Sequence, residues 1–361
     1  MATRKNGQPV TKNGSKKAAV LQATKAGHPK TEESPFRVIC IGASAGGLNA
    51  VGELLSQLPV TLNAAVFVVL HLSRAAIGEL LVERIKKNAK LPCSLAENNE
   101  IMQPGHIYIA LPDAHLLIKN DRMLLGKGPA ENRFRPSIDV LFRSAATYYR
   151  ERTIGVILTG YLNDGTAGMW AIKQNGGHCV VQDPNEAEYP DMPMSVLETM
   201  DVDHCVSLNK MGNIILNIVR ENKPKKVVPS AMVKAESKLS ERIATSLEEV
   251  SDVGEKTVYS CPDCGGGLWK IVNGNLQHYR CHIGHSYSEK DLNMQQAETI
   301  EHTLWVAIRM MEERKILLVK MGKQHGEKGL QKLGSSFREQ AKELDNHIAK
   351  MKELLFAINR S

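Results

Sequence analysis

Three side chains, Ser44, His71 and Asp164, combine residue types that could carry out hydrolysis, and each stands where a loop begins. Each follows a continuously apolar, largely β-branched run, namely 37–41, 65–70 and 154–160. Such runs are typical of strands buried on both faces of a parallel sheet. Ligands bind beyond the carboxyl ends of such strands, so we expect the three side chains to meet at one sheet edge. A hydroxyl nucleophile, an imidazole base and an orienting carboxylate make up a hydrolytic triad.

Ser44 lies in a glycine-rich turn, Gly42-Ala43-Ser44-Ala45-Gly46-Gly47. The G-x-S-x-G match falls between an expected strand and an expected helix, which is the context of a strained nucleophile turn. Backbone N–H groups at the helix start, that of Ala45 included, would stabilise an oxyanion. The alternative is a phosphate-binding loop, but the segment lacks the Walker lysine and does not match G-x-G-x-x-G.

His71 and Asp164 each have an ordinary structural explanation when taken alone. A histidine at a strand end is often only a satisfied polar group, and an aspartate before a helix is a common N-cap. Their joint placement with the serine turn favours the triad. The chain order Ser, His, Asp differs from the Ser, Asp, His order of α/β-hydrolases, so we expect another fold with the same chemistry.

The elements that must position these residues alternate between strand-like and helix-like segments from 36 to about 221. This pattern predicts an α/β fold with a doubly wound, mostly parallel sheet and helices on both faces. We expect helices at 46–58, 78–89, 137–149, 166–175 and 193–200. We also expect 105–111 and 116–125 to form a two-stranded insertion.

The 361 residues, 42% of them apolar, are enough for two or three domains. We expect a basic disordered tail (1–35), the α/β domain (36–221), a linker (222–257), a small Cys/His-rich module (258–292) and a helical pair (293–361). The tail contributes much of the net charge of +7, and we assign it no function. The sequence lacks a run of the ~20 apolar residues that a membrane span needs, lacks the pattern of a secretory signal and has few cysteines, so we expect a cytoplasmic protein.

Cys261-Pro-Asp-Cys264 and Cys281-His-Ile-Gly-His285 are separated by sixteen residues. Two thiolates on one turn, with a thiolate and an imidazole on another, supply the tetrahedral set that structural zinc prefers. The spacing therefore predicts a zinc site at Cys261, Cys264, Cys281 and His285, with His278 or His282 as substitutes for His285. A redox pair is disfavoured because no thioredoxin-like βαβ unit surrounds the C-x-x-C turn, and a metal-free β module is the other alternative.

The first half of the chain resembles a known family, the chemotaxis protein-glutamate methylesterases of the CheB type. The resemblance runs from about 36 to 207, through segments 38–47, 69–71, 104–110, 135–142, 155–160, 163–165 and 192–193. It places the family's catalytic residues on Ser44, His71 and Asp164. It implies hydrolysis of glutamyl methyl esters on the cytoplasmic helices of chemoreceptors, often deamidation of glutamines there, and no catalytic cofactor.

Several positions depart from the family pattern. Many relatives have threonine where this chain has Ala45, and Met-Gly where it has Tyr161-Leu162. Losing that glycine restricts the loop, and Tyr161 is expected to reshape the pocket mouth. Arg135 either holds an acidic receptor helix or belongs to an ordinary helix start. The family's regulatory form also carries an N-terminal receiver domain that accepts a phosphoryl group, whereas this chain has only the basic tail there. We therefore expect no phosphorylation-driven release of autoinhibition within this polypeptide.

The leading hypothesis is thus a methylesterase that acts on a methylated chemoreceptor or a receptor-like coiled coil. The Cys/His module resembles an extension found on some methylesterases, and with the helical pair we expect it to dock a partner or to self-associate. One alternative is an inactive scaffold that binds methylated receptor helices and recruits partners through the module. Another is a nucleic-acid-binding zinc-ribbon protein, for which we expect only weak, salt-sensitive binding.

Overall fold

The structure of the chain is a computed structural model that describes residues 36–71, 78–221, 228, 230–240, 247–274 and 276–358. The predicted basic tail lies outside the described residues. None of the helices in the described ranges is long and apolar enough to span a membrane.

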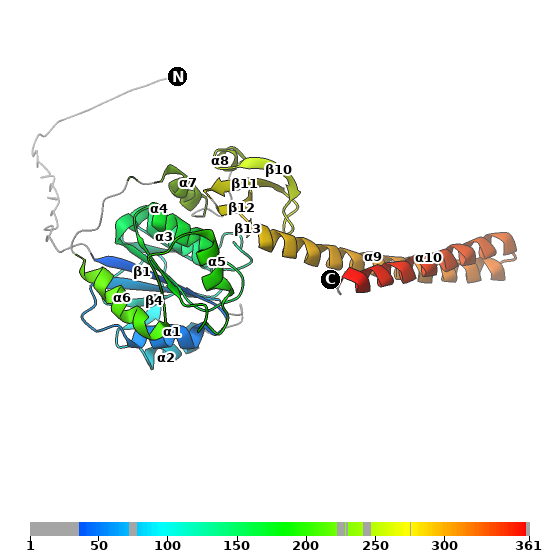
Figure 1. Cartoon of the computed structure of the whole chain (residues 1–361). Coiled ribbons are helices and arrows are strands. Elements are labelled where there is room, and N and C mark those ends of the chain that lie inside the picture. Colours follow the sequence, from blue (N-terminus) through cyan, green and yellow to red (C-terminus); the bar gives the residue numbers. More distant parts are fainter. Residues whose placement is uncertain are drawn as a thin grey trace, which may run out of the picture. The chain divides into compact units, whose positions relative to one another are not determined.

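In the described residues, seven parallel strands form the central sheet (Figure 1). Their order is β3 (Cys93–Leu95), β4 (Ile107–Ile109), β2 (Ala64–Leu70), β1 (Arg37–Ala43), β7 (Thr153–Ile157), β8 (His178–Gln182) and β9 (His204–Val206). The chain first builds the sheet on one side of β1 and later on the other, which creates a switch point between β1 and β7. The predicted doubly wound parallel sheet is confirmed.

Helices cover both faces of this sheet (Figure 1). One face is covered by α1 (Gly47–Ser56), α2 (Gly78–Lys86) and α6 (Leu208–Arg220), and the other by α3 (Ile138–Tyr149), α4 (Thr166–Gln174) and α5 (Asp191–Thr199). Side chains of β1 alternate between the two cores, with Ile39 and Ile41 in one and Val38 and Cys40 in the other. Burial on both faces explains why the strand is continuously apolar. A short 3₁₀ turn, Arg150–Arg152, leads into β7.

The predicted two-stranded insertion is wrong in its pairing. Strand β4, expected to belong to it, instead lies between β2 and β3 in the main sheet. The hairpin is formed by β5 (His115–Lys119) and β6 (Arg122–Gly126). Their two-residue turn consists of Asn120 and Asp121, both with positive φ (49° and 61°), as hairpin turns of this length favour. The sequence therefore contained the turn signal inside the stretch that was expected to be one strand.

The C-terminal part begins with α7 (Ala231–Ser240) and α8 (Leu247–Ser251), which lie in the stretch expected to be a linker. An antiparallel sheet follows, made of β10 (Glu255–Ser260), β11 (Gly267–Asn273), β12 (Leu276–Cys281) and β13 (Ser286–Ser288). The chain ends in two helices, α9 (Glu289–Glu327) and α10 (Gln331–Ile358). These two helices pack along each other and are joined by the ion pairs Lys315–Asp345 and Glu312–Lys352, both 2.8 Å.

Candidate active site at the carboxyl edge of the sheet

Ser44 and His71 directly follow the neighbouring strands β1 and β2. The strand pairing continues past both ends, since the His71 N–H donates to the Ala43 carbonyl at 3.1 Å and the Ser44 N–H donates to the Thr159 carbonyl at 3.0 Å. The second of these bonds ties the serine turn to the loop after β7, the loop that carries Asp164. The three residues therefore gather at the switch point of the sheet.

The structure joins His71 and Asp164 directly. The imidazole Nε2 lies 2.9 Å from Asp164 Oδ2, and both side chains are buried. Phe134 stacks on the imidazole with ring centroids 3.6 Å apart and planes 7° from parallel. The buried Nδ1 of His71 has no hydrogen-bond partner within the described residues, and so Ser44 Oγ is not bonded to it. Asp164 thus holds one edge of the imidazole ring and Phe134 holds one face, which leaves Nδ1 available to accept a proton.

Asp164 is buried yet accepts hydrogen bonds on both oxygens. Oδ1 accepts from Asn132 Nδ2 (2.9 Å), Ser137 Oγ (2.8 Å) and the Asp139 N–H (3.3 Å), and Oδ2 accepts from His71 and the Ile138 N–H (2.6 Å). Two of these donors are backbone groups at the N-terminus of α3, which favours negative charge. Burial by itself would raise the pKa of Asp164, but the hydrogen bonds from His71, Asn132 and Ile138 hold it below its ordinary value. The carboxylate is therefore ionised at neutral pH.

A second buried carboxylate, Asp139, lies beside the first. Asn132 Nδ2 donates to its Oδ2 at 2.7 Å and the Gly168 N–H donates to its Oδ1 at 2.6 Å. Burial, together with the negative charge of Asp164, raises the pKa of Asp139 to about 7. Asn132 thus spends both amide hydrogens as a neutral bridge between the two carboxyl groups.

Close packing and a positive φ shape the serine turn. Gly46 has φ 71°, and the Gly47 N–H donates back to the Ser44 carbonyl at 2.9 Å. A Cβ on Gly160 would lie 2.7 Å from the Cβ of Ser44, so only glycine fits beside the serine. Ala45 is half-buried, and its carbonyl accepts a bond from Thr159 Oγ1 at 3.1 Å. The expected oxyanion role of its N–H stays a prediction.

The other two residues expected to contact substrate lie near the site in different settings. Tyr161 is 52% exposed and tilts against Tyr189, with ring centroids 4.4 Å apart. The guanidinium of Arg135 is engaged by the protein, because Nε and Nη2 donate to Asp113 Oδ1 (3.0 and 2.7 Å) and Nη1 donates to the Gly128 carbonyl (2.8 Å). Substrate contact by either residue stays a prediction.

Leu162, in the loop before Asp164, has φ 66°, the left-handed conformation that glycine adopts without strain. The loop therefore keeps a glycine-like conformation although the residue is leucine.

Sequence reasoning missed Asn132, Phe134 and Ser137 as site residues. Ser137 stands at the N-cap of α3, where a serine is an ordinary helix cap, but its hydroxyl donates to Asp164. The signal that could have found it is the helix start itself, because N–H groups at a helix N-terminus attract a carboxylate. Asn132 and Phe134 lie in a loop without periodicity, and only the folded structure brings them to the dyad.

A candidate metal centre lies in the Cys/His module, where donor atoms of Cys261, Cys264, Cys281 and His285 are all within 4.8 Å of one another. The Sγ atoms of Cys264 and Cys281 are 3.8 Å apart, and His285 Nδ1 lies 3.6 Å from the Sγ atoms of both Cys261 and Cys281. Tetrahedral zinc, with bonds of about 2.3 Å to sulfur and 2.0–2.1 Å to nitrogen, would separate its ligands by about 3.8 and 3.6 Å. The donor set therefore fits zinc. His278 is instead paired with Glu236 at 2.7 Å.

Comparisons with known proteins match about half of the chain. The family model described as CheB methylesterase matches residues 39–215. A protein of Leptospira interrogans, described as a putative protein-glutamate methylesterase/protein-glutamine glutaminase, is 39% identical over 188 residues, which cover 52% of this chain and 97% of the relative. The protein-glutamate methylesterase/protein-glutamine glutaminase of Photorhabdus laumondii is 37% identical over 187 residues, which cover 51% of this chain and 53% of the relative. The chain thus matches about half the length of the longer relative.

Among solved structures, the Thermotoga maritima CheB methylesterase catalytic domain matches with 31% identity and a TM-score of 0.49. The match covers 51% of this chain and 99% of that one.

Proposed function

Because this chain belongs to the CheB methylesterase family, we propose that it hydrolyses glutamyl methyl esters of proteins through Ser44, His71 and Asp164, and deamidates glutamines by the same route. The observation that carries the proposal is the buried His71–Asp164 hydrogen bond at the switch point, with Ser44 at the adjoining strand end. A carboxylate that fixes a histidine beside a serine turn is the arrangement that nucleophilic acyl transfer requires.

We propose the following role for each group in the reaction. Asp164 keeps a proton on His71 Nε2, which leaves Nδ1 as the base. Ser44 Oγ attacks the γ-carbonyl carbon and gives its proton to Nδ1, which passes it to the departing methanol or ammonia. The glutamyl group is then esterified to Ser44, and a water molecule, deprotonated by His71, releases the glutamate side chain and regenerates the serine. The N–H of Ala45 is placed at the helix start, where it would stabilise the oxyanion.

Methanol release separates this proposal from the inactive scaffold. The substrate is a peptide carrying a glutamate γ-methyl ester, and the Ser44→Ala variant is expected to release no methanol while remaining folded. Ser56→Ala is the matched control, because Ser56 lies at the far end of the helix that follows the nucleophile, and its hydroxyl donates to the Glu53 carbonyl of the same helix. A wild-type protein that releases no methanol would support the scaffold.

We propose a methylated chemoreceptor or receptor-like coiled coil as the macromolecular substrate, and the cytoplasm as the location, because the family's ester-bearing receptor helices are cytoplasmic. Tyr161 would contact the substrate at the rim of the site, since it is exposed within the loop that carries Asp164. Arg135 would contribute only if its bond to Asp113 opens. Mass spectrometry of receptors from cells with and without Ser44 identifies the glutamates that stay esterified.

We propose that Cys261, Cys264, Cys281 and His285 hold a structural zinc ion and that no cofactor takes part in catalysis. The support is the match between the observed donor separations and those of tetrahedral zinc. A bound ion would lock the turn before β11 to the turn between β12 and β13. Metal analysis of reduced protein is expected to show one equivalent, and a small fraction of an equivalent would rule the site out.

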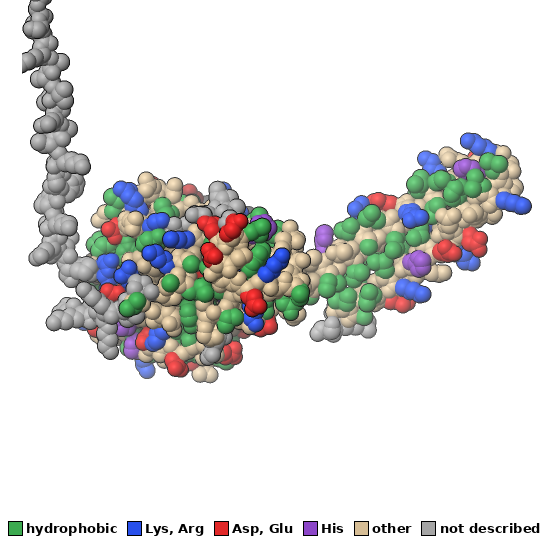
Figure 2. All heavy atoms as spheres, turned by 90° about the horizontal axis from the view of Figure 1, so that it is seen from above, with side chains coloured by type: hydrophobic (Ala, Val, Ile, Leu, Met, Phe, Trp, Pro, Cys, Tyr) green, Lys and Arg blue, Asp and Glu red, His purple; other side chains and the backbone are tan. Residues whose placement is uncertain are grey.

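We propose that the helical pair α9–α10 binds a partner or a second copy of this chain. Figure 2 shows apolar side chains along the surface of this pair. Ile300, Trp305 and Met310 of α9 are about half exposed, and so is Leu354 of α10. Exposed apolar surface of this kind on long helices usually buries against another surface. Light scattering of the wild type and of Trp305→Glu tests self-association.

The five-part division of the chain stays part of the proposal, and limited proteolysis tests it.

A further inference from the structure

Alternate residues of the turn Glu131–Phe134 contact two different parts of the protein, the esterase site and the C-terminal part of the chain. Asn132 and Phe134 contact the catalytic pair, whereas Glu131 and Arg133 form ion pairs with β12 and α9. We propose that this turn couples the Cys/His module to the esterase site, with Asn132 and Phe134 as positioning residues for Asp164 and His71. The inference rests on the proposed function.

The inner contacts fix both members of the catalytic pair. Asn132 donates to Asp164 Oδ1 at 2.9 Å, and Phe134 lies flat against His71 with centroids 3.6 Å apart. Neither residue has a group that takes part in the chemistry. Each restricts the orientation of a group that does, so displacement of the turn would disturb the acid and the base together.

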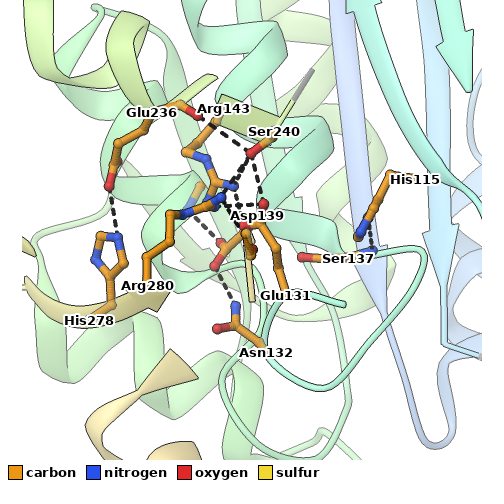
Figure 3. A network of polar contacts seen from close by, with 12 residues as sticks. His115, Glu131, Asn132, Ser137, Asp139, Arg143, Glu236, Ser240, His278 and Arg280 are labelled. Atoms are coloured by element: carbon orange, nitrogen blue, oxygen red, sulfur yellow. Dashed lines mark hydrogen bonds and ion pairs between the residues drawn. The ribbon is translucent and has the colours of Figure 1, made fainter. Parts of the chain in front are cut away.

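The outer contacts anchor the turn in a buried ionic network (Figure 3). Glu131 is 3% exposed, lies 2.6 Å from the Arg280 guanidinium of β12, and also pairs with Arg143 of α3 and with Ser240 of α7. Two residues along the chain, Arg133 pairs with Glu298 of α9 at 2.7 Å. The buried guanidinium groups of Arg143 and Arg280 together compensate the charge of Glu131, and Arg280 ties it to β12.

Backbone contacts extend the same connection. The Asn132 N–H donates to the Ser286 carbonyl at 2.8 Å, and Glu131 pairs with Ser286 in parallel, so the turn adds to the edge of β13. Asn163, the residue before Asp164, donates from Nδ2 to Ser288 Oγ at 2.6 Å. The loop of the catalytic acid and the turn that bonds it therefore both contact β13.

The turn depends on these contacts for two reasons. Asn132 and Arg133 are consecutive residues with left-handed backbones, φ 49° and 71°, a conformation that persists only where surrounding structure enforces it. In addition, a cavity of about 370 Å³ lies against the interface, lined by polar residues that include Asn132, Asn163 and Ser288. The turn is therefore supported by a few polar contacts more than by close packing. Anything that shifts β12, β13 or the start of α9 would reach the catalytic pair through it.

The main test replaces Arg280 by Met in the full chain and measures methanol release from the γ-methyl ester peptide. Mutations along a coupling network change function by about 2- to 30-fold, and we expect kcat to fall by about tenfold while KM stays within twofold. Arg280→Lys, which keeps the charge, is expected to recover part of the loss. Arg309→Met is the matched control, because Arg309 is exposed and pairs only along its own helix with Glu313. It is expected to keep the wild-type kcat.

A charge swap at the exposed pair gives a second test that does not depend on folding of a buried-site variant. Glu298→Lys is expected to lower kcat about twofold or more, and Arg133→Glu combined with Glu298→Lys is expected to restore it. Asn132→Gly keeps the backbone conformation and the bond to Ser286 but removes the amide, and should lower kcat without changing KM.

Labelling of Ser44 by a fluorophosphonate separates two kinds of failure. If the wild type is labelled and releases methanol, but Arg280→Met and Glu298→Lys keep the wild-type kcat, the coupling is refuted and the esterase stands. If the wild type is neither labelled nor active, the proposed function fails and the coupling with it.

Discussion

Asp164→Asn tests the catalytic arrangement most directly, because the amide must place an NH₂ group where the carboxylate accepts hydrogen bonds. Oδ1 of Asp164 faces three donors, and Oδ2 faces the Ile138 N–H and His71 Nε2. The NH₂ group therefore goes to the Oδ2 position, where it meets fewer donors. His71 Nε2 must then accept a hydrogen bond, which moves its proton to Nδ1. The base is then blocked at the atom that should take the serine proton.

The expected losses of kcat and of stability both follow from these contacts. In a serine protease triad, the same wrong-tautomer change lowers kcat by about 10⁴-fold, and we expect a loss of that order here. The buried Ile138 N–H loses its acceptor, which costs about 1–3 kcal/mol of stability. The loss of the favourable negative charge at the α3 N-terminus costs about 0.3–1 kcal/mol more. Asp164→Asn should therefore lower the free energy of unfolding by about 1–4 kcal/mol.

Methanol release gives kcat, and urea unfolding followed by circular dichroism gives the free energy of unfolding. Asp203→Asn is the control, because Asp203 lies just before β9, at the opposite edge of the sheet from the site. Its carboxylate likewise accepts a backbone N–H, that of Cys179 (2.8 Å), and pairs with Lys173. That variant should keep activity within twofold. An Asp164→Asn protein with activity within tenfold of wild type would refute the assigned roles of His71 and Asp164.

Three further results are expected. Gly160→Ala puts a Cβ against Ser44 and Met192, so kcat should fall by more than about tenfold and the free energy of unfolding by about 1–3 kcal/mol; steady-state kinetics showing wild-type kcat would contradict this. Because Leu162 has φ 66°, Leu162→Val should be less stable than wild type by about 1–2 kcal/mol, and Leu162→Gly should be close to wild type. Urea unfolding of the three proteins measures this ranking. Burial would raise the pKa of Glu131, but Arg143 and Arg280 hold it well below its usual range. The stability from Glu131 is therefore present above about pH 4.3, the unfolded value, and is lost as pH falls below it. Unfolding free energies measured from pH 3 to 7 should depend less on pH in Glu131→Gln.

The fold class and the meeting of Ser44, His71 and Asp164 at one sheet edge could be predicted because their signals are local in the chain. A strand buried on both faces must be continuously apolar, and the residue after such a strand must lie at the ligand-binding edge of a parallel sheet. Ser44, His71 and Asp164 were found in this way, and the G-x-S-x-G turn needed only its flanking strand and helix. The Cys261–His285 spacing is local for the same reason, since two short turns bring four donors together.

Contacts between distant segments could be decided only by the tertiary structure. Nothing periodic marks Asn132 or Phe134, yet the chain places one on Asp164 and the other on His71, and ties the turn between them to Arg280 and Glu298. Strand β4 joined the main sheet because pairing with β2 and β3 buries both of its faces, which its own three residues do not reveal. Local sequence patterns thus predict which residues react. The tertiary structure decided which residues hold them in place, because hydrogen bonds and ion pairs across long loops depend on positions that no local pattern encodes.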